Sequence, residues 1–312
     1  MSNALGVDVS KATLQACADP AQPSRSFANT AQGVAQLLAW AAAQPPSRVV
    51  FEASGGYEQR LLQALLAAGW PACRLNAQQV HHFAKALGQR AKSDPVDAKV
   101  LQRYGQLLAP PAHVPPAPEQ AHLLQLVKRR SQLVAMRTRE INRSHHAQDA
   151  LADSHQRLQQ ALNEELKRIE ALITRCLQQA APLARRVQLL ASAPGIARVT
   201  ASSLCAGLPE LGRYGRRAIS ALSGLAPLAR DSGAHHGQRH IAGGRALPRV
   251  ALYQATLSAL RFNPPIKALY QRLKAKGKPS KVAMTACMRH LLCMLNAMVR
   301  DDRPWAYPAA MS

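Results

Sequence analysis

A run of prolines divides this chain into two parts that differ strongly in charge. The segment Pro110–Pro118, PPAHVPPAP, holds five prolines in nine residues. Such a segment cannot be helical and forms a stiff linker. Residues 1–118 carry 10 basic and 6 acidic residues, a net charge of +4, whereas residues 119–312 carry 30 and 11, a net charge of +19. We therefore expect a catalytic or cofactor-binding module before the linker and a polyanion-binding part after it.

The composition is that of a folded, strongly basic protein. Hydrophobic residues make up 47% of the 312 residues and the formal net charge is +23, which excludes a disordered basic tail and favours nucleic acid as the partner. The six cysteines form no CxxC pair, a pattern typical of reduced thiols. Because the sequence begins without a secretory signal and its apolar runs 34–43 and 61–70 are too short to span a bilayer, we expect a cytoplasmic protein with no membrane partner.

Short apolar runs that alternate with helical patterns predict an α/β fold for the first module. Ala4–Val9 and Thr13–Ala18 are predicted to form a hairpin of two strands. The stretches 48–51 and 71–75 have the pattern of buried strands, and 30–43 and 56–68 have helical spacing. Hairpin strands followed by β-α-β units predict a mixed sheet.

Four acidic residues stand where this fold would bring them together. Asp8 and Glu52 lie at the ends of predicted strands, where open α/β sheets bind ligands. In the segment 92–100, KSDPVDAKV, a helix is predicted to begin with a proline at its first position. Asp94 and Asp97 then point the same way, with Cβ atoms about 5–6 Å apart. These carboxylates suit one or two Mg²⁺ ions and phosphoryl displacement; the structural alternatives are helix capping, a turn cap and a solvated loop residue.

Several segments resemble, in order, one family of recombination enzymes. GVDVSK (6–11), FEASGGYE (51–58) and KSDPVDAKVL (92–101) are similar to the DEDD transposases of bacterial insertion sequences, of the 110/1111 family, which are related to the Piv DNA invertase. After the linker, LLASAPGIARVTA, ALSGLAPLARDSG and RVALYQA continue the resemblance. The resemblance implies an RNase H-like domain, as in the Holliday-junction resolvase RuvC, whose Mg²⁺ (or Mn²⁺) ligands are Asp8, Glu52, Asp94 and Asp97.

The resemblance also implies a domain order. Residues 1–109 would be the α/β, RuvC-like DEDD catalytic domain with a mixed sheet, and 110–118 the Pro-rich linker. A mostly α-helical, coiled-coil-like region, 119–182, and a C-terminal transposase domain, 183–312, would follow. In that last domain the family places a serine nucleophile, which corresponds to Ser232 in the segment Asp231-Ser232-Gly233. From the residues alone, D-S-G is ordinary turn chemistry.

Ser232 would attack a DNA phosphate and hold the broken strand as a phosphoserine until strand exchange. A serine needs activation, and the family resemblance implies that the carboxylate cluster of a neighbouring subunit assists. The resemblance further implies donor and target double-stranded DNA as substrates, a structured bridge RNA as a guide and a dimer of dimers in the bacterial nucleoid. One departure is Ile241-Ala242-Gly243-Gly244-Arg245, which lacks the hydroxyl and lysine of the family's I-S-K-x-G-like stretch.

Basic residues after the linker are candidate phosphate contacts. Residues 120–143 and 156–179 are predicted to form two long helices, the second with a coiled-coil-like seam through Leu162, Leu166, Ile169, Ile173 and Cys176. The turn Pro194-Gly195-Ile196 resembles a phosphate-binding hairpin, and KAKGKPSK (274–281) is predicted to be a mobile loop. The predicted nucleic-acid contacts are Lys128, Arg129, Arg130, Arg137, Arg139, Arg143, Arg239, Arg245, Lys274, Lys276, Lys278 and Lys281.

Three other functions remain open at this point. A metal-dependent junction nuclease would use the carboxylates without covalent chemistry at Ser232. A nucleotide-binding kinase would need a glycine where Val9 follows Asp8. A basic architectural protein leaves the grouped acids unexplained. His235, His236 and His240 lie near Ser232, where they are candidates for proton transfer, and their spacing is unlike that of a zinc site.

Overall fold

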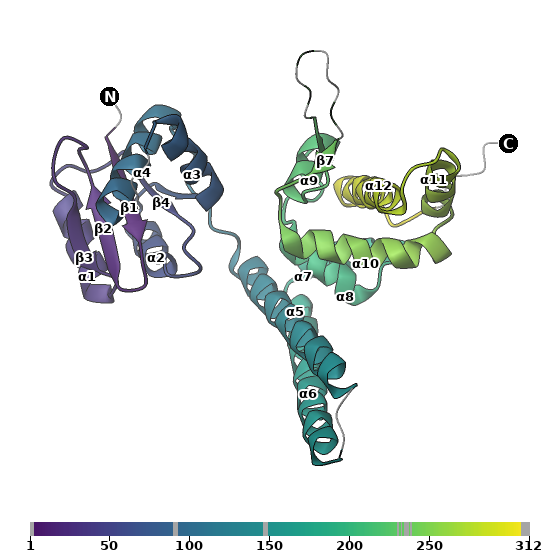
Figure 1. Ribbon diagram of the computed structural model, residues 1–312. Helices are drawn as coiled ribbons and strands as arrows, with labels where there is room; N and C mark the ends of the chain where they lie inside the picture. Colours follow the sequence, from purple (N-terminus) through teal and green to yellow (C-terminus); the bar gives the residue numbers. More distant parts are fainter. Residues whose placement is uncertain are drawn as a thin grey trace. The chain divides into compact units, whose positions relative to one another are not determined.

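The computed structural model describes residues 3–89, 93–145, 149–229, 231, 233, 237 and 239–306. The chain forms two compact units, Met1–Pro115 and Pro116–Ser312 (Figure 1). Each unit has its own hydrophobic core. The residues between Pro110 and Ala117 form neither helix nor strand.

The N-terminal unit is built on a five-stranded mixed sheet in the order β3-β2-β1-β4-β5. Strands β1, β2 and β3 pair antiparallel, whereas β4 runs parallel to both β1 and β5. The predicted hairpin and mixed sheet are therefore confirmed, and β3 is a strand that the sequence did not predict. The strands are β1 (Ala4–Val9), β2 (Thr13–Cys17), β3 (Arg25–Ala28), β4 (Arg48–Glu52) and β5 (Ala72–Leu75).

Helices cover both faces of this sheet because its strands are apolar on both sides. One cluster joins Leu5 and Val7 to Val34 of α1 (Ala31–Ala41) and Leu61 of α2 (Gln59–Ala67). A second cluster joins Val50 to α3 (Ala77–Ala86) and α4 (Asp94–Leu108). Successive strand residues point to opposite faces, so β1 sends Leu5, Val7 and Val9 toward α1 and α2 and leaves its alternate residues facing α4.

The start of the proline-rich segment lies along the edge strand β5. The backbone N–H of His113 donates to the carbonyl oxygen of Ala72 at 2.6 Å. The Sγ atom of Cys73 lies 3.3 Å from the carbonyl oxygen of Pro110. The first residues of this segment therefore belong to the N-terminal unit.

The second unit begins with two long antiparallel helices, α5 (Pro118–Ser144) and α6 (Asp149–Gln179), which lie side by side in Figure 1. Both helices were predicted; α5 extends beyond both predicted ends, whereas α6 begins seven residues earlier than predicted and ends at the predicted residue, Gln179. The predicted seam is confirmed, since all five of its residues are buried: Leu162, Leu166, Ile169, Ile173 and Cys176.

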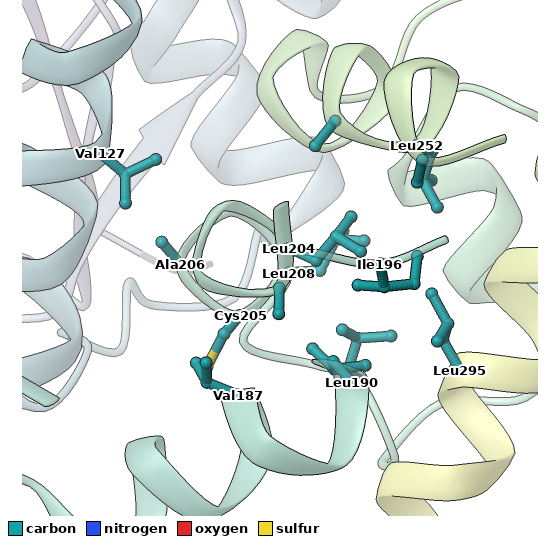
Figure 2. Close-up of a cluster of buried hydrophobic side chains, with 14 of the residues drawn as sticks. Val127, Val187, Leu190, Ile196, Leu204, Cys205, Ala206, Leu208, Leu252 and Leu295 are labelled. Carbon is teal, nitrogen blue, oxygen red and sulfur yellow. The ribbon is translucent and has the colours of Figure 1, made fainter. Parts of the chain in front are cut away.

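Shorter helices complete this unit around an apolar core. Leu190, Leu204 and Leu252 come from three of these helices and meet in one cluster with Leu295 (Figure 2). The remaining elements are α7 (Ala181–Ala191), α8 (Arg198–Gly207), α9 (Arg216–Leu222), β6 (Pro227–Leu228), β7 (His240–Ile241), α10 (Ala246–Phe262), α11 (Pro264–Ala275) and α12 (Ser280–Arg300).

Two segments interpreted from the sequence have defined places in this unit. The segment 274–281, predicted as a mobile loop, contains a four-residue connection, 276–279, between the end of α11 at Ala275 and the start of α12 at Ser280. The Pro194-Gly195-Ile196 turn packs inward: a Cβ atom on Gly195, where φ is +92°, would stand 2.7 Å from the backbone nitrogen of Ala259 in α10. This turn therefore serves the packing of α8 against α10.

Helix α12 is long and apolar enough to cross a membrane by length and composition, the single such helix within the described residues. Its apolar side chains are used inside the unit. Cys287, Leu291, Leu292 and Leu295 are each 0% exposed. The hydrophobicity of α12 is therefore that of a core helix.

Candidate active site

Asp8 and Glu52 lie beside each other at one edge of the sheet. In the parallel pairing of β1 and β4, Gly6 stands opposite Val50. Asp8 and Glu52 each follow two residues later, so the same register brings them together on the face that Val50 presents to α4. The strand ends predicted to carry ligands thus meet.

Helix α4 lies close against these two strands because glycines remove the intervening side chains. A Cβ atom on Gly6 would stand 2.2 Å from the carbonyl oxygen of Ala98 in α4. A Cβ atom on Gly105, further along α4, would stand 2.8 Å from side-chain atoms of both Ala4 and Val50. This close approach carries the first turn of α4, with Asp94 and Asp97, toward the end of β1.

The four carboxylates are electrostatically coupled. The pKa of Asp8 is raised from 3.8 to about 6, first by burial and then by the negative charges of Asp97, Asp94 and Glu52. Like charges disfavour ionisation of a neighbouring acid. Each of the other three acids therefore acts on Asp8 in the folded unit, and the cluster concentrates negative charge that a cation would offset.

A cavity of about 760 Å³ opens over this cluster, and Asp8, Glu52 and Asp97 line it. Its opposite side is formed by α3, which contributes His81 and Lys85. This wall was not predicted from the sequence, because no helix was expected here. The signal was present: Asn76 accepts the N–H of Gln78 at 2.9 Å as an N-cap, and Val80 is the buried residue of the following turn.

The donor set has the chemistry of a hard-cation site. Carboxylate oxygens are the ligands that Mg²⁺ prefers, and this ion keeps several waters and takes one or two protein carboxylates. Among the described residues, no three His, Cys, Asp or Glu side chains lie close enough to hold one ion in common. Asp8, Glu52 and Asp97 share one cavity, and this arrangement fits a hydrated Mg²⁺ better than a fully protein-ligated ion.

The loop after Glu52 is held by Glu58, a residue for which the sequence predicted no role. Glu58 is 3% exposed, and its Oε2 accepts the backbone N–H groups of Ser54 at 3.1 Å and Gly56 at 2.9 Å. Its Oε1 lies 3.6 Å from Arg74. Although burial acts to raise the pKa of Glu58, these N–H groups and Arg74 hold it below its ordinary value. Glu58 thus fixes the backbone directly after Glu52.

The predicted nucleophile belongs to the connection between β6 and β7. Ser232, His235 and His236 lie outside the described residues. The two short strands pair antiparallel, with Leu228 opposite His240, and Asp231 receives a hydrogen bond from Arg239 at 3.4 Å. In the sequence, Ser232 thus stands between two strands that pair with each other.

Glycines fix the base of this hairpin. A Cβ atom on Gly244 would stand 2.0 Å from the backbone nitrogen of Gly224, and both residues have positive φ, +66° and +67°. Gly244 therefore allows two backbone segments to touch. Ala242 and Gly243 stand where the family pattern has the hydroxyl and the lysine, and a Cβ atom on Gly243 would meet nothing within 4 Å, so packing does not explain that departure.

Comparison with known proteins places both units in one family. Residues 5–152 match the family model for the DEDD transposases of IS110, described as a transposase. Residues 187–271 match the model described as the transposase IS116/IS110/IS902 family. The chain belongs to the IS110 family of transposases. It is accordingly an enzyme of DNA transposition or recombination, as the sequence motifs predicted.

The IS110-family protein is similar along its whole length to two DNA-inverting proteins. The pilin gene-inverting proteins of Moraxella bovis and Moraxella lacunata are each 28% identical over 315 aligned residues, which cover 96% of this chain and 97% of each relative. An IS110 insertion-element protein of 43.6 kDa from Streptomyces coelicolor is 29% identical over 143 residues, 45% of this chain and 34% of that protein.

The structure divides the predicted nucleic-acid contacts of this IS110-family transposase into two groups. In the first group a side chain of the same unit already engages the basic residue. Arg245 makes two hydrogen bonds to Glu210, at 2.6 and 2.7 Å, and another to the Gly207 carbonyl oxygen. The others are Arg130 with Glu170 at 2.7 Å, Arg137 with Asn163 at 3.1 Å, Arg143 with Glu140 at 3.6 Å, Arg239 with Asp231 at 3.4 Å and Lys274 with Ser280 at 3.1 Å.

The second group is exposed and has no ion pair or side-chain hydrogen bond within the described part of the chain. It comprises Lys128, Arg129, Arg139, Lys276, Lys278 and Lys281. These six cations are available to phosphate, whereas a paired arginine such as Arg245 must first give up its carboxylate. For Arg130, Arg137 and Arg245 the partner is 40, 26 and 35 residues away in the sequence.

Proposed function

We propose that this IS110-family transposase cuts and rejoins DNA through a serine–phosphate intermediate formed by Ser232, with Mg²⁺ (or Mn²⁺) bound by Asp8, Glu52, Asp94 and Asp97 of an RNase H-like domain. The observation that carries the proposal is the single cavity that Asp8, Glu52 and Asp97 line together, with Asp94 in the same first turn of α4 as Asp97. The sheet order, with β1 between an antiparallel hairpin and two parallel strands, supports the RNase H-like, RuvC-like assignment.

In the proposed reaction, the Ser232 oxygen forms a bond to the phosphorus of a DNA phosphate. The bond between that phosphorus and a deoxyribose oxygen breaks, the serine proton passes to a base, and the departing oxygen takes up a proton. Attack by a new deoxyribose hydroxyl reverses these steps and releases Ser232. When bound, Mg²⁺ supplies charge neutralisation at the phosphate oxygens and lowers the pKa of its ligands. The four carboxylates would hold the metal ion. We propose that the carboxylates that act on a given Ser232 come from a neighbouring subunit in a dimer of dimers.

We further propose that donor and target double-stranded DNA are selected through a structured bridge RNA. The +19 net charge of residues 119–312 supports a large polyanion. Sequencing of the RNA that copurifies with the protein tests this part. A single structured RNA supports guidance by RNA, and heterogeneous fragments count against it.

The covalent step is tested by substitution of the nucleophile. Ser232→Ala should abolish both the covalent protein–DNA adduct and recombination, while Ser131→Ala, an exposed serine on α5, should retain both. An adduct of undiminished yield from Ser232→Ala would show that another group attacks. If the products are hydrolysed ends with no joined strands, the protein acts as a metal-dependent junction nuclease.

The carboxylates are tested separately. Asp94→Asn and Asp97→Asn should each remove Mg²⁺-dependent strand cleavage and leave DNA binding largely intact. Asp19→Asn, an exposed acid of the same unit that accepts the N–H of Ala21, is the matched control. Recombination that survives both Asp94→Asn and Asp97→Asn would overturn the metal site.

A further inference from the structure

A second cavity, in the C-terminal unit, is lined by basic residues that were not among the predicted nucleic-acid contacts. It measures about 910 Å³ and lies between α9, α11 and α12. Its rim carries Arg216 and Arg217 at the start of α9 and Arg289 and His290 in the middle of α12. We call this cavity the α9–α12 groove.

The arginines of this groove are unpaired. Arg216, Arg217 and Arg289 are exposed, and none of them has an ion pair or side-chain hydrogen bond in the part of the chain that the structure describes. None of the residues that line the groove is acidic. In contrast, Arg245 in the same unit is held by Glu210. The groove thus keeps positive charge that nothing in the described part of the unit neutralises.

The charges in the groove are close enough to act on one another. The pKa of His290 is lowered, first by partial burial and then by the positive charges of Arg216, Arg272 and Arg289. Arg272 on α11 therefore adds a further cation near the groove. Such mutual repulsion destabilises the empty groove, and binding of an anion relieves it.

Part of the groove lining is apolar. Leu269 and Leu273 of α11 and Met294 of α12 line the groove together with the arginines. Apolar side chains lower the local dielectric and so strengthen the attraction between the arginines and an anion. Arginine is also the side chain that binds phosphate through paired N–H donors.

The groove is continuous with the hairpin that carries the proposed nucleophile. A neighbouring cavity of about 300 Å³ shares Pro227, Ala286 and Arg289 with it. That cavity is lined by Arg239 and His240 from the hairpin and by Lys281 from α12. Cations therefore run from the start of α9, across α12, to the base of the segment that contains Ser232.

We propose that the α9–α12 groove binds successive phosphates of the DNA strand that enters the β6–β7 hairpin for cleavage. This inference rests on the proposed function, because DNA is chosen over other polyanions by the residues of β6 and β7 that line the neighbouring cavity and that precede and follow Ser232 in the sequence. Arg216, Arg217 and Arg289 contact the phosphates, and the strand continues past Lys281 toward the hairpin. The groove is a binding site for substrate backbone and takes no part in the chemical step.

The test removes three charges from the groove and measures DNA affinity across a range of salt concentrations. The full-length variant Arg216→Gln/Arg217→Gln/Arg289→Gln is compared with Arg157→Gln/Lys167→Gln/Arg175→Gln, which removes three exposed charges from α6. Each bound phosphate contributes a slope of about −0.9 to log K against log salt for duplex DNA. The groove variant should lose roughly two to three of these contributions, and the α6 variant less than one.

Three further measurements decide between outcomes. The variant Arg216→Lys/Arg217→Lys/Arg289→Lys should keep most of the slope, which separates loss of charge from loss of folding. The groove variant should lose less affinity for a duplex RNA than for a duplex DNA of equal length. A loss of affinity confined to RNA would reassign the groove to RNA and overturn the proposal. An unchanged salt slope for DNA would also overturn it. Ser232→Ala should keep the wild-type slope without forming an adduct, so failure of the groove and failure of the nucleophile are distinguishable.

Discussion

Gly6 of β1 and Ala98 of α4 are in backbone contact, and each lies within two residues of one proposed metal ligand. Asp8 follows Gly6 on the strand, and Asp97 precedes Ala98 on the helix. The contact therefore sets how closely the strand-end carboxylates approach those of the helix. Gly6, which has no side chain, thus sets the spacing of the four carboxylates.

Gly6→Ala should displace α4 and disrupt the carboxylate cluster. The added methyl group meets backbone atoms, which cannot move aside as the end of a side chain can. Overpacking of this kind costs about 1–3 kcal/mol of unfolding free energy, so we expect a lower denaturation midpoint and loss of strand cleavage. The control is Gly215→Ala, since a Cβ atom there meets nothing within 4 Å. Full activity of Gly6→Ala would show that this contact does not position the acids.

Asp8→Asn should stabilise the metal-free protein at pH 7. Asp8 has a folded pKa of about 6 against an ordinary 3.8, so its ionised form is disfavoured by folding. Its protonated form is favoured, and the wild type loses stability as pH rises from about 4 to 6. The expected gain is about 1–3 kcal/mol at pH 7 and close to zero at pH 3.5. Urea denaturation at both pH values in a chelator measures it, and an equal effect at both would refute the assignment.

Glu58→Gln should have the opposite dependence on pH. The pKa of Glu58 is lowered in the folded protein, so its contribution to stability is present above the ordinary pKa of 4.5 and is lost as pH falls through the folded value. The glutamine keeps one acceptor oxygen but loses the charge that faces two backbone N–H groups and Arg74. We expect a loss of about 1–2 kcal/mol at pH 7, measured by thermal denaturation. Gln63→Ala, an exposed residue of the same helix α2, is the neighbouring control.

Arg245→Gln should affect folding more than nucleic-acid binding. Its guanidinium is held by both oxygens of Glu210, and the pair is partly exposed, so we expect a loss of only about 0.5–1 kcal/mol. The salt dependence of DNA binding should be unchanged. In Lys128→Gln/Arg129→Gln, which alters two unpaired cations, the slope should fall by roughly 0.9 for each phosphate that the variant no longer binds. A larger change in slope from Arg245→Gln would identify it as a phosphate-binding residue.

The strands that are buried on one or both faces could be predicted from the sequence, because alternating or continuous apolar residues mark them. β3 was not predicted because Phe27 is its single buried residue. The strands β6 and β7 have two residues each, which is too short to show an apolar periodicity. Asp94 and Asp97 were found together because helix geometry relates them locally. The pairing of Arg245 with Glu210 and the meeting of Arg216 with Arg289 join distant segments, so charge counting along the chain could not separate occupied cations from free ones.

The hydrogen bond from His113 to Ala72 bears on where the N-terminal unit can be cut for separate expression. A fragment that stops at Ala109 lacks this bond and the interaction of Pro110 with Cys73. The outer edge of β5 is then bare, and unpaired strand edges recruit strands from other molecules. A fragment that runs to Pro115 keeps both interactions along β5, so we expect it to aggregate less than the fragment that stops at Ala109.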